Sequence, residues 1–277
     1  RVSDERLYRS YQMIDKVMAV PEVLHQQLID AYKLYLVIGG MPEAVSTYLD
    51  TRSWEEVRVV QYAILQSYSL DFAKHISNKD IPRVFQLARE DKKFRYGDVQ
   101  KGGRAREYEG AIEWLCLAGL VHRVSAIETP RLPLSAYKKS NAFKLYLNDV
   151  GLLGRKFDLD ASTILMGDNL FTEFKGVMAE NYVLQALVRQ YGNQHYYWTS
   201  GNTAEVEFVL QDAGWIIPVE VKANKNVTAK SLAYYRKQYA PQLSIRLSTL
   251  NMRKDDDLLN VPLYLVDKLK ALCSAEG

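Results

Sequence analysis

Two strand-like runs separated by a short turn constrain the fold of this chain more than any other feature. They span residues 204–210 and 215–223, and Asp212-Ala213-Gly214 joins them. Because side chains alternate between the two faces of a strand, Glu205 and Glu207 share one face of the first run and apolar side chains fill the other. This pattern predicts a β-hairpin with one buried apolar face and one face that carries carboxylates.

The second run also carries charge on one face, because Glu220 and Lys222 flank Val221. If the two runs pair as a hairpin, Glu207 and Glu220 converge at one edge of the sheet. Carboxylates placed this close repel one another unless a cation intervenes. The alternative interpretation is a structural ion pair between Glu220 and Lys222.

A helix predicted at 173–191 supplies a further carboxylate. Glu180 lies beside the apolar stripe of this helix, which includes Leu184 and Leu187. A lone buried carboxylate is unfavourable, so Glu180 needs a cation, a hydrogen-bond donor or a raised pKa. Lys222, or a divalent cation held by Glu207 and Glu220, would meet that need.

The first part of the chain has a helical pattern. A helix is predicted at 21–38, where Gly39-Gly40 ends it, and Pro42 begins a short helix. The sequence Ser53-Trp54-Glu55-Glu56 has the form of a capping box and predicts the start of a long helix that ends near residue 75.

The following region has the element order of a winged helix-turn-helix, which we place at about 78–153. Its predicted helices span 82–89, 96–101 and 104–117, and its predicted strands span 120–127 and 142–147. Lys101, Arg104 and Arg106 lie at or near the start of the third helix, where contacts with DNA phosphates would form. The alternative is a solvated basic face on a domain that packs against protein.

The last part of the chain alternates helices and strands. Further strands are predicted at 195–199, 244–248 and 262–265, and a helix is predicted at 229–239. We therefore predict an α+β protein, with a helical region that contains the winged helix-turn-helix at 1–155, a linker at 156–172 and a mixed α/β domain at 173–277.

Composition bears on the cellular location of the protein and on whether it contacts a membrane. The 277 residues include only two cysteines, Cys116 and Cys273, which argues against a disulfide framework and predicts a cytoplasmic location. No apolar run approaches the length of a membrane span and no signal peptide opens the chain, so we expect no membrane partner. The first residue is Arg1 rather than Met, so we expect the chain to be part of a longer protein.

The carboxylates and the lysine resemble a known catalytic pattern. A helix Glu, an acidic residue on a strand and a following Glu-x-Lys are similar to the PD-(D/E)xK nucleases, which include restriction endonucleases. The resemblance implies a restriction-endonuclease-like fold for 173–277, with Glu180, Glu207, Glu220 and Lys222 as catalytic residues. Glu207 and Glu220 would hold Mg²⁺, and Lys222 would orient the attacking water or stabilise charge on the phosphate.

Motifs along the whole chain resemble a narrower family. They are GGMPEAV at 39–45, KLYLNDVGLL at 144–153, GVMAENYV at 176–183, AEVEFVL at 204–210 and IIPVEVKA at 216–223. In this order they look like the C-terminal half of bacterial AAA-type ATPases whose tail is domain of unknown function 4143. That family usually has Asp where this chain has Glu207.

The resemblance implies a P-loop ATPase domain upstream in the same polypeptide. The printed sequence has no G-x-x-x-x-G-K-[ST], so we expect ATP to act only through a domain outside it. Two functions remain open. One is a DNA-binding, magnesium-dependent endonuclease, and the other is a non-catalytic module that binds nucleic acid or protein and regulates the ATPase domain.

Other candidate sites are weaker. The histidines, His25, His75, His122 and His195, have no ligand spacing. Asp255-Asp256-Asp257 is typical of a solvated loop. Tyr196-Tyr197-Trp198 could stack on bases, but at strand spacing such residues more often belong to the core.

Overall fold

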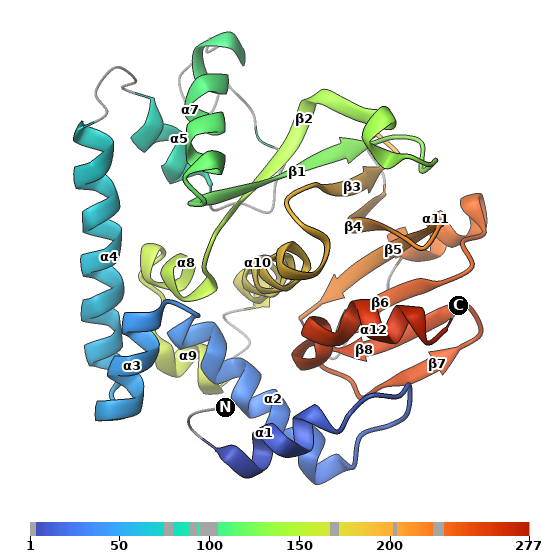
Figure 1. Ribbon diagram of the computed structural model, residues 1–277, viewed down its shortest axis with the longest axis horizontal. Coiled ribbons are helices and arrows are strands. Elements are labelled where there is room, and N and C mark those ends of the chain that lie inside the picture. Colours follow the sequence, from blue (N-terminus) through green and yellow to red (C-terminus); the bar gives the residue numbers. More distant parts are fainter. Residues whose placement is uncertain are drawn as a thin grey trace.

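One mixed sheet organises the molecule. In this computed structural model, which describes residues 4–74, 80–88, 94, 105–166, 172–201, 204–223 and 230–276, the described strands form an 8-stranded sheet in the order β2-β1-β3-β4-β5-β6-β8-β7 (Figure 1). The strands are β1 (Val121–Ile127), β2 (Lys138–Leu147), β3 (His195–Thr199), β4 (Glu205–Asp212), β5 (Trp215–Lys222), β6 (Ser244–Ser248), β7 (Arg253–Asp255) and β8 (Leu258–Pro262).

The sheet continues across the predicted domain boundary. β1 pairs with β2 in antiparallel orientation, as the winged helix predicts, and its other edge pairs with β3 in parallel. The predicted linker at 156–172 contains a short helix, α9 (Ala161–Met166), which packs against α2 (Glu22–Ile38). The predicted regions 1–155 and 173–277 thus contribute strands to the same sheet. Their division into separate domains remains a prediction.

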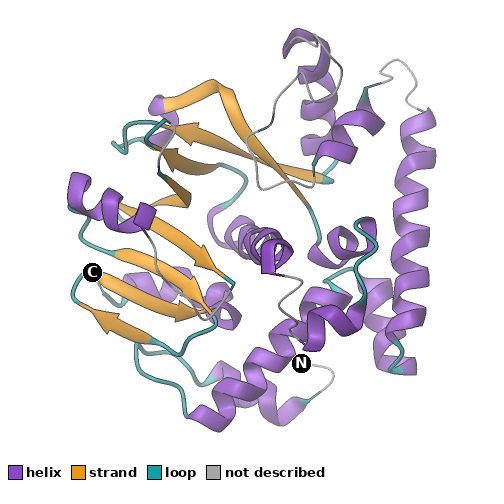
Figure 2. Ribbon diagram, turned by 180° about the vertical axis from the view of Figure 1, so that it is seen from behind, coloured by secondary structure: helices purple, strands orange, loops and turns teal. Residues whose placement is uncertain are grey.

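Helices cover both faces of this sheet (Figures 1 and 2). α10 (Thr172–Tyr191) packs on one face in the main hydrophobic core, and α11 (Lys230–Tyr239) packs on the other, where Tyr235 contacts Trp198. The remaining described helices are α1 (Glu5–Gln12), α3 (Pro42–Thr51), α4 (Trp54–Lys74), α5 (Ile81–Leu87), α7 (Ala105–Leu117), α8 (Val150–Lys156), α12 (Leu269–Ser274), η1 (Leu134–Tyr137) and η3 (Leu263–Lys268).

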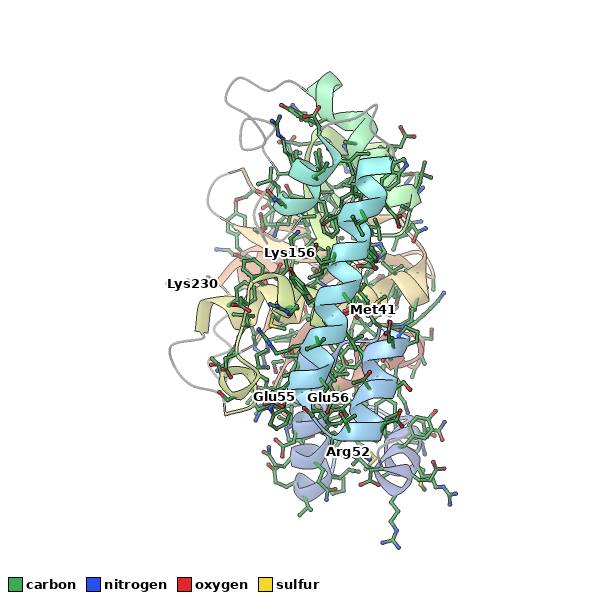
Figure 3. The ribbon with its side chains drawn as sticks, turned by 90° about the vertical axis from the view of Figure 1, so that its left-hand side faces the viewer. Met41, Arg52, Glu55, Glu56, Lys156 and Lys230 are labelled. Carbon is green, nitrogen blue, oxygen red and sulfur yellow. The ribbon has the colours of Figure 1, made fainter. Side chains whose placement is uncertain are left out.

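The fold class predicted from the sequence is confirmed: a helical N-terminal part precedes a sheet-rich part in an α+β protein. Local signals explain why the helices begin where they do. The Oγ atom of Ser53 accepts a hydrogen bond from the backbone N of Glu56 at 3.2 Å, as an N-cap should. Figure 3 shows Glu55 and Glu56 in the first turn of α4, where carboxylates interact favourably with the helix dipole.

Two expectations about elements differ from the structure or lie outside it. The strand predicted at 262–265 is wrong, because β8 ends at Pro262 and the 3₁₀ helix η3 follows. Residues 258–266 are almost uniformly apolar and buried, so periodicity cannot separate strand from helix there. The helix predicted at 96–101 lies outside the described residues.

Polar side chains of α10 join the helical part to the sheet. The Oδ1 atom of Asn181 accepts from the backbone N of Leu147 at 3.0 Å, and the Oε1 atom of Gln185 accepts from the backbone N of Val150 at 3.1 Å. Three sequence motifs thus meet at the turn between β2 and α8, because Asp149 in this turn also accepts from the backbone N of Gly40 at 2.7 Å. These contacts fix the end of β2 over α10.

Candidate functional site

The hairpin register brings the two strand carboxylates together. β4 and β5 are antiparallel, and Phe208 pairs with Val219. The pairing ends at these two residues, and Glu207 and Glu220 follow directly on the two strands, where the charge of Glu220 acts on Glu207. α10 packs against β5 and places Glu180 near them. The structure therefore gathers the four residues that the sequence selected, Glu180, Glu207, Glu220 and Lys222.

Only one of the two carboxylate oxygens of Glu220 has a polar partner. The residue is 2% exposed, and its Oε1 atom lies 2.5 Å from the Nζ atom of Lys222. Its Oε2 atom is buried and has no hydrogen-bond partner. A buried carboxylate oxygen without a donor is unfavourable, so this atom is a candidate ligand for a cation.

Glu207 lies in an unusually negative environment. The residue is partly exposed, yet its carboxylate is enclosed by protein and accepts a hydrogen bond from the backbone N of Val221 at 3.2 Å. Burial, and then the nearby charges of Glu220 and Glu180, raise the pKa of Glu207 well above its ordinary value, while Lys222 opposes this rise. A carboxyl group of this kind binds either a proton or a cation.

The pKa of Lys222 depends on the same group of carboxylates. Burial alone would lower the pKa of Lys222, but the charges of Glu207, Glu220 and Glu180 outweigh it, and the net pKa is raised. The ammonium group therefore stays charged. Its side chain remains about a quarter exposed (26%), so the ammonium group is accessible from solvent.

Glu180 is buried and has a specific donor. Its Oε2 atom accepts a hydrogen bond from the hydroxyl of Tyr146 at 2.9 Å, and the Nζ atom of Lys144 lies 3.9 Å away. The sequence predicted that this carboxylate needs a donor or a cation, and the structure supplies both from β2. Neither Tyr146 nor Lys144 was selected from the sequence as a site residue.

A sequence signal for these two residues does exist. The run Ala142-Phe143-Lys144-Leu145-Tyr146-Leu147 places a lysine inside an otherwise apolar strand. At strand spacing Lys144 and Tyr146 share one face, while Phe143, Leu145 and Leu147 face a second core with α5 and α7. A charged residue in the middle of such a strand is a reason to expect a buried partner.

The site can offer oxygen ligands to a divalent cation, but few of them. No group of three or more His, Cys, Asp or Glu side chains is arranged to hold a metal within the described ranges. The pair Glu207 and Glu220 remains, with one orphaned oxygen. Mg²⁺ is commonly bound through one or two carboxylates and keeps several waters, so this pair fits such an ion.

The predicted DNA-binding residues cannot be placed. Lys101 and Arg104 lie outside the described residues, and Arg106 lies in α7 with a side chain that is not described. Contact with DNA by these residues stays a prediction.

The weaker candidates are parts of the core or surface. Tyr196, Tyr197 and Trp198 are buried, which confirms the core interpretation. His25 is buried and its Nδ1 atom lies 2.8 Å from the hydroxyl oxygen of Tyr264. Asp257 forms an ion pair with Arg236.

Comparisons with known families agree with part of the sequence-based expectation. Residues 175–265 match the family described as Domain of unknown function (DUF4143). That domain is associated with AAA-type ATPases, so the resemblance is confirmed for the motifs at 176–183, 204–210 and 216–223, which lie within the match. Residues 29–163 match a second family, described as Domain of unknown function (DUF8612).

The other comparisons add no relative. Neither the curated proteins nor the solved structures contain a match to the chain. Among the helices in the described part of the chain, none combines the length and the apolar character that crossing a lipid bilayer requires.

Proposed function

We propose that this chain is a nuclease-like, DNA-binding module of an AAA-type ATPase-family protein. Its site at Glu180, Glu207, Glu220 and Lys222 would cleave phosphodiester bonds in a reaction that depends on Mg²⁺. The observation that carries the proposal is the buried, unpartnered Oε2 atom of Glu220 beside Glu207 and Lys222. The match to the DUF4143 family supports the association with an ATPase.

Each residue has a definite part in this proposal. Glu207 and Glu220 hold the cation, which when bound activates water and neutralises charge on the phosphate. Lys222 stabilises the negative charge that develops on the phosphate oxygens, for which its Nζ atom must turn from Glu220 towards the substrate. Glu180, which accepts a hydrogen bond from Tyr146, would add negative charge beside Glu207 and so favour a bound cation.

Cleavage of DNA tests the proposal. Purified protein is incubated with linear and branched DNA in the presence of Mg²⁺ or Mn²⁺, and the products are separated by electrophoresis. We expect cleavage by the wild type and a loss of at least about 100-fold in Lys222→Ala. Lys33→Ala is the matched control, because Lys33 lies on α2 and pairs with Asp30. Absence of cleavage by the wild type with either ion would refute the catalytic part.

A second function is favoured by two observations. Lys222 is engaged by Glu220, and no arrangement of three or more metal-ligating side chains occurs in the described part of the chain. Both suit a non-catalytic module that binds nucleic acid or protein and regulates the ATPase domain. In that case DNA binding, measured by fluorescence anisotropy, is unchanged in Lys222→Ala and weakened by Arg104→Glu and Arg106→Glu. DNA binding that is unchanged in both arginine variants would count against the winged helix as the DNA-binding surface.

A further inference from the structure

Lys144 is a charged group that is as deeply buried as Glu220. The residue is 2% exposed, and its Nζ atom lies 2.6 Å from the Oε1 atom of Glu205 and 3.9 Å from the Oε2 atom of Glu180. The ring of Tyr197 lies 5.2 Å from the same Nζ atom. An ammonium group in this position bridges a carboxylate from β4 and a carboxylate from α10.

This bridge has the geometry of a cation between two carboxylates. Glu205 lies two residues before Glu207 on β4, and the charge of Glu207 also acts on Lys144, so this bridge borders the pair that is proposed to hold a metal. In sites with two metal ions, the ions lie about 3.5–4 Å apart and stabilise the attacking and leaving oxygens. Here an ammonium group lies between the carboxylates of Glu180 and Glu205. A buried ammonium persists only when it is paired in this way.

We infer that Lys144 is a positioning residue that acts as a built-in cation between Glu180 and Glu205, and that it restricts the site to a single divalent cation at Glu207 and Glu220. The inference rests on the proposed function for the identity of the Glu207 and Glu220 site. Lys144 itself does not touch the substrate. It holds Glu180 and Glu205 at a fixed separation and occupies the place of a second metal ion.

The number of bound Mn²⁺ ions tests this inference. Electron paramagnetic resonance of free Mn²⁺ gives the number of ions bound per chain at constant ionic strength. Lys144→Ala opens the space between the two carboxylates, so it should bind one more Mn²⁺ than the wild type. Lys144→Arg retains the charge, and Lys144→Ala combined with Glu205→Gln lacks one ligand, so both should bind the same number as the wild type.

The outcomes separate the two proposals. If Lys144→Ala binds no more Mn²⁺ than the wild type, the role of Lys144 is refuted. If the wild type itself binds none, metal binding at Glu207 and Glu220 fails, while the difference between Lys144→Ala and the wild type still decides the role of Lys144.

Loss of folding is also informative. A variant that lacks only a cation should recover when a cation is supplied, so millimolar MnCl₂ should raise the melting temperature of Lys144→Ala more than that of the wild type. The double variant with Glu205→Gln should lack this extra gain. A Lys144→Ala protein that stays unfolded in MnCl₂ would overturn the inference.

Discussion

The Nζ atom of Lys222 lies 2.5 Å from the Oε1 atom of Glu220, whereas the Oε2 atom of the same carboxylate has no hydrogen-bond partner. The ion pair therefore satisfies one half of a carboxylate that is almost fully buried. Glu207 lies on the neighbouring strand and has a raised pKa because of burial and of the charges of Glu220 and Glu180. The hairpin holds more negative charge than Lys222 alone can balance, which is the physical basis for expecting a cation there.

The ion pair itself makes a prediction about stability in the absence of metal. Lys222→Met leaves Glu220 buried beside Glu207 without its ammonium partner, and should lower the free energy of unfolding by about 3 kcal/mol. In the double variant Lys222→Met with Glu220→Gln, most of this loss should be recovered. Urea denaturation in EDTA measures the four proteins of this cycle, and a coupling energy near zero would contradict the prediction.

The contact between Gly39 and Asp149 predicts a steric requirement. Gly39 has a φ of +75°, and a Cβ atom at this position would lie 2.2 Å from the Oδ1 atom of Asp149. Gly39→Ala should therefore lower the free energy of unfolding by at least about 2 kcal/mol. Gly176→Ala is the matched control, because a Cβ atom there meets nothing within 4 Å and alanine favours a helix. Equal melting temperatures for the two variants would contradict this account.

The junction between α10 and β2 predicts the cost of losing one acceptor. Asn181→Ala leaves the backbone N–H of Leu147 buried without a partner, which should cost about 1–3 kcal/mol in the free energy of unfolding. Gln26→Ala should change stability by less than about 0.5 kcal/mol, because Gln26 bonds Asp30 on an exposed face. Chemical denaturation compares the free energies of unfolding of the two variants. If Asn181→Ala is as stable as the wild type, the hydrogen bond from Leu147 to Asn181 does not stabilise this junction.

A buried histidine predicts sensitivity to acid. Burial lowers the pKa of His195 to about 4, although the bond from its Nε2 atom to the carbonyl of Gly192 opposes this shift. Because the folded pKa lies below that of the unfolded chain, the unfolded state binds more protons between about pH 6.5 and pH 4, and stability is lost as pH falls through this range. His195 should account for about 2 kcal/mol of the loss between pH 7 and pH 5.

Urea denaturation of His195→Gln at the two pH values checks this contribution. The variant should lose about 2 kcal/mol less than the wild type between pH 7 and pH 5. An equal loss in both proteins would assign the acid sensitivity to other groups.

Local signals in the sequence predicted most of the elements on which the site depends. The Ser53 cap and the Gly39-Gly40 stop each act within a few residues and are confirmed by α4 and α2, and the hairpin predicted at 204–223 is confirmed by β4 and β5. The single apolar face predicted for 204–210 is wrong, because the β3–β4 pairing shifts register and Val206 packs in a different core from Phe208. The hairpin turn places Glu207 and Glu220 directly after the last pair of the β4–β5 ladder, where their charges interact.

Contacts between distant parts of the chain were harder to predict. Lys144 reaches Glu205 because β2, β1 and β3 join the same sheet as β4, and the parallel pairing of β1 with β3 leaves no local trace in the sequence. The bond from Tyr146 to Glu180 depends on how α10 packs against β2. Residues 262–265 were assigned to a strand because a run that is apolar on every side has no period.

The most direct test of the account is the position of a bound divalent cation. Crystals of the protein soaked in MnCl₂ give an anomalous difference map that locates manganese without reference to activity. The account predicts one peak between the carboxylates of Glu207 and Glu220, within ligand distance of the Oε2 atom of Glu220, and no peak in Glu220→Gln. A map with no peak at these carboxylates would contradict the claim that this site holds a metal ion.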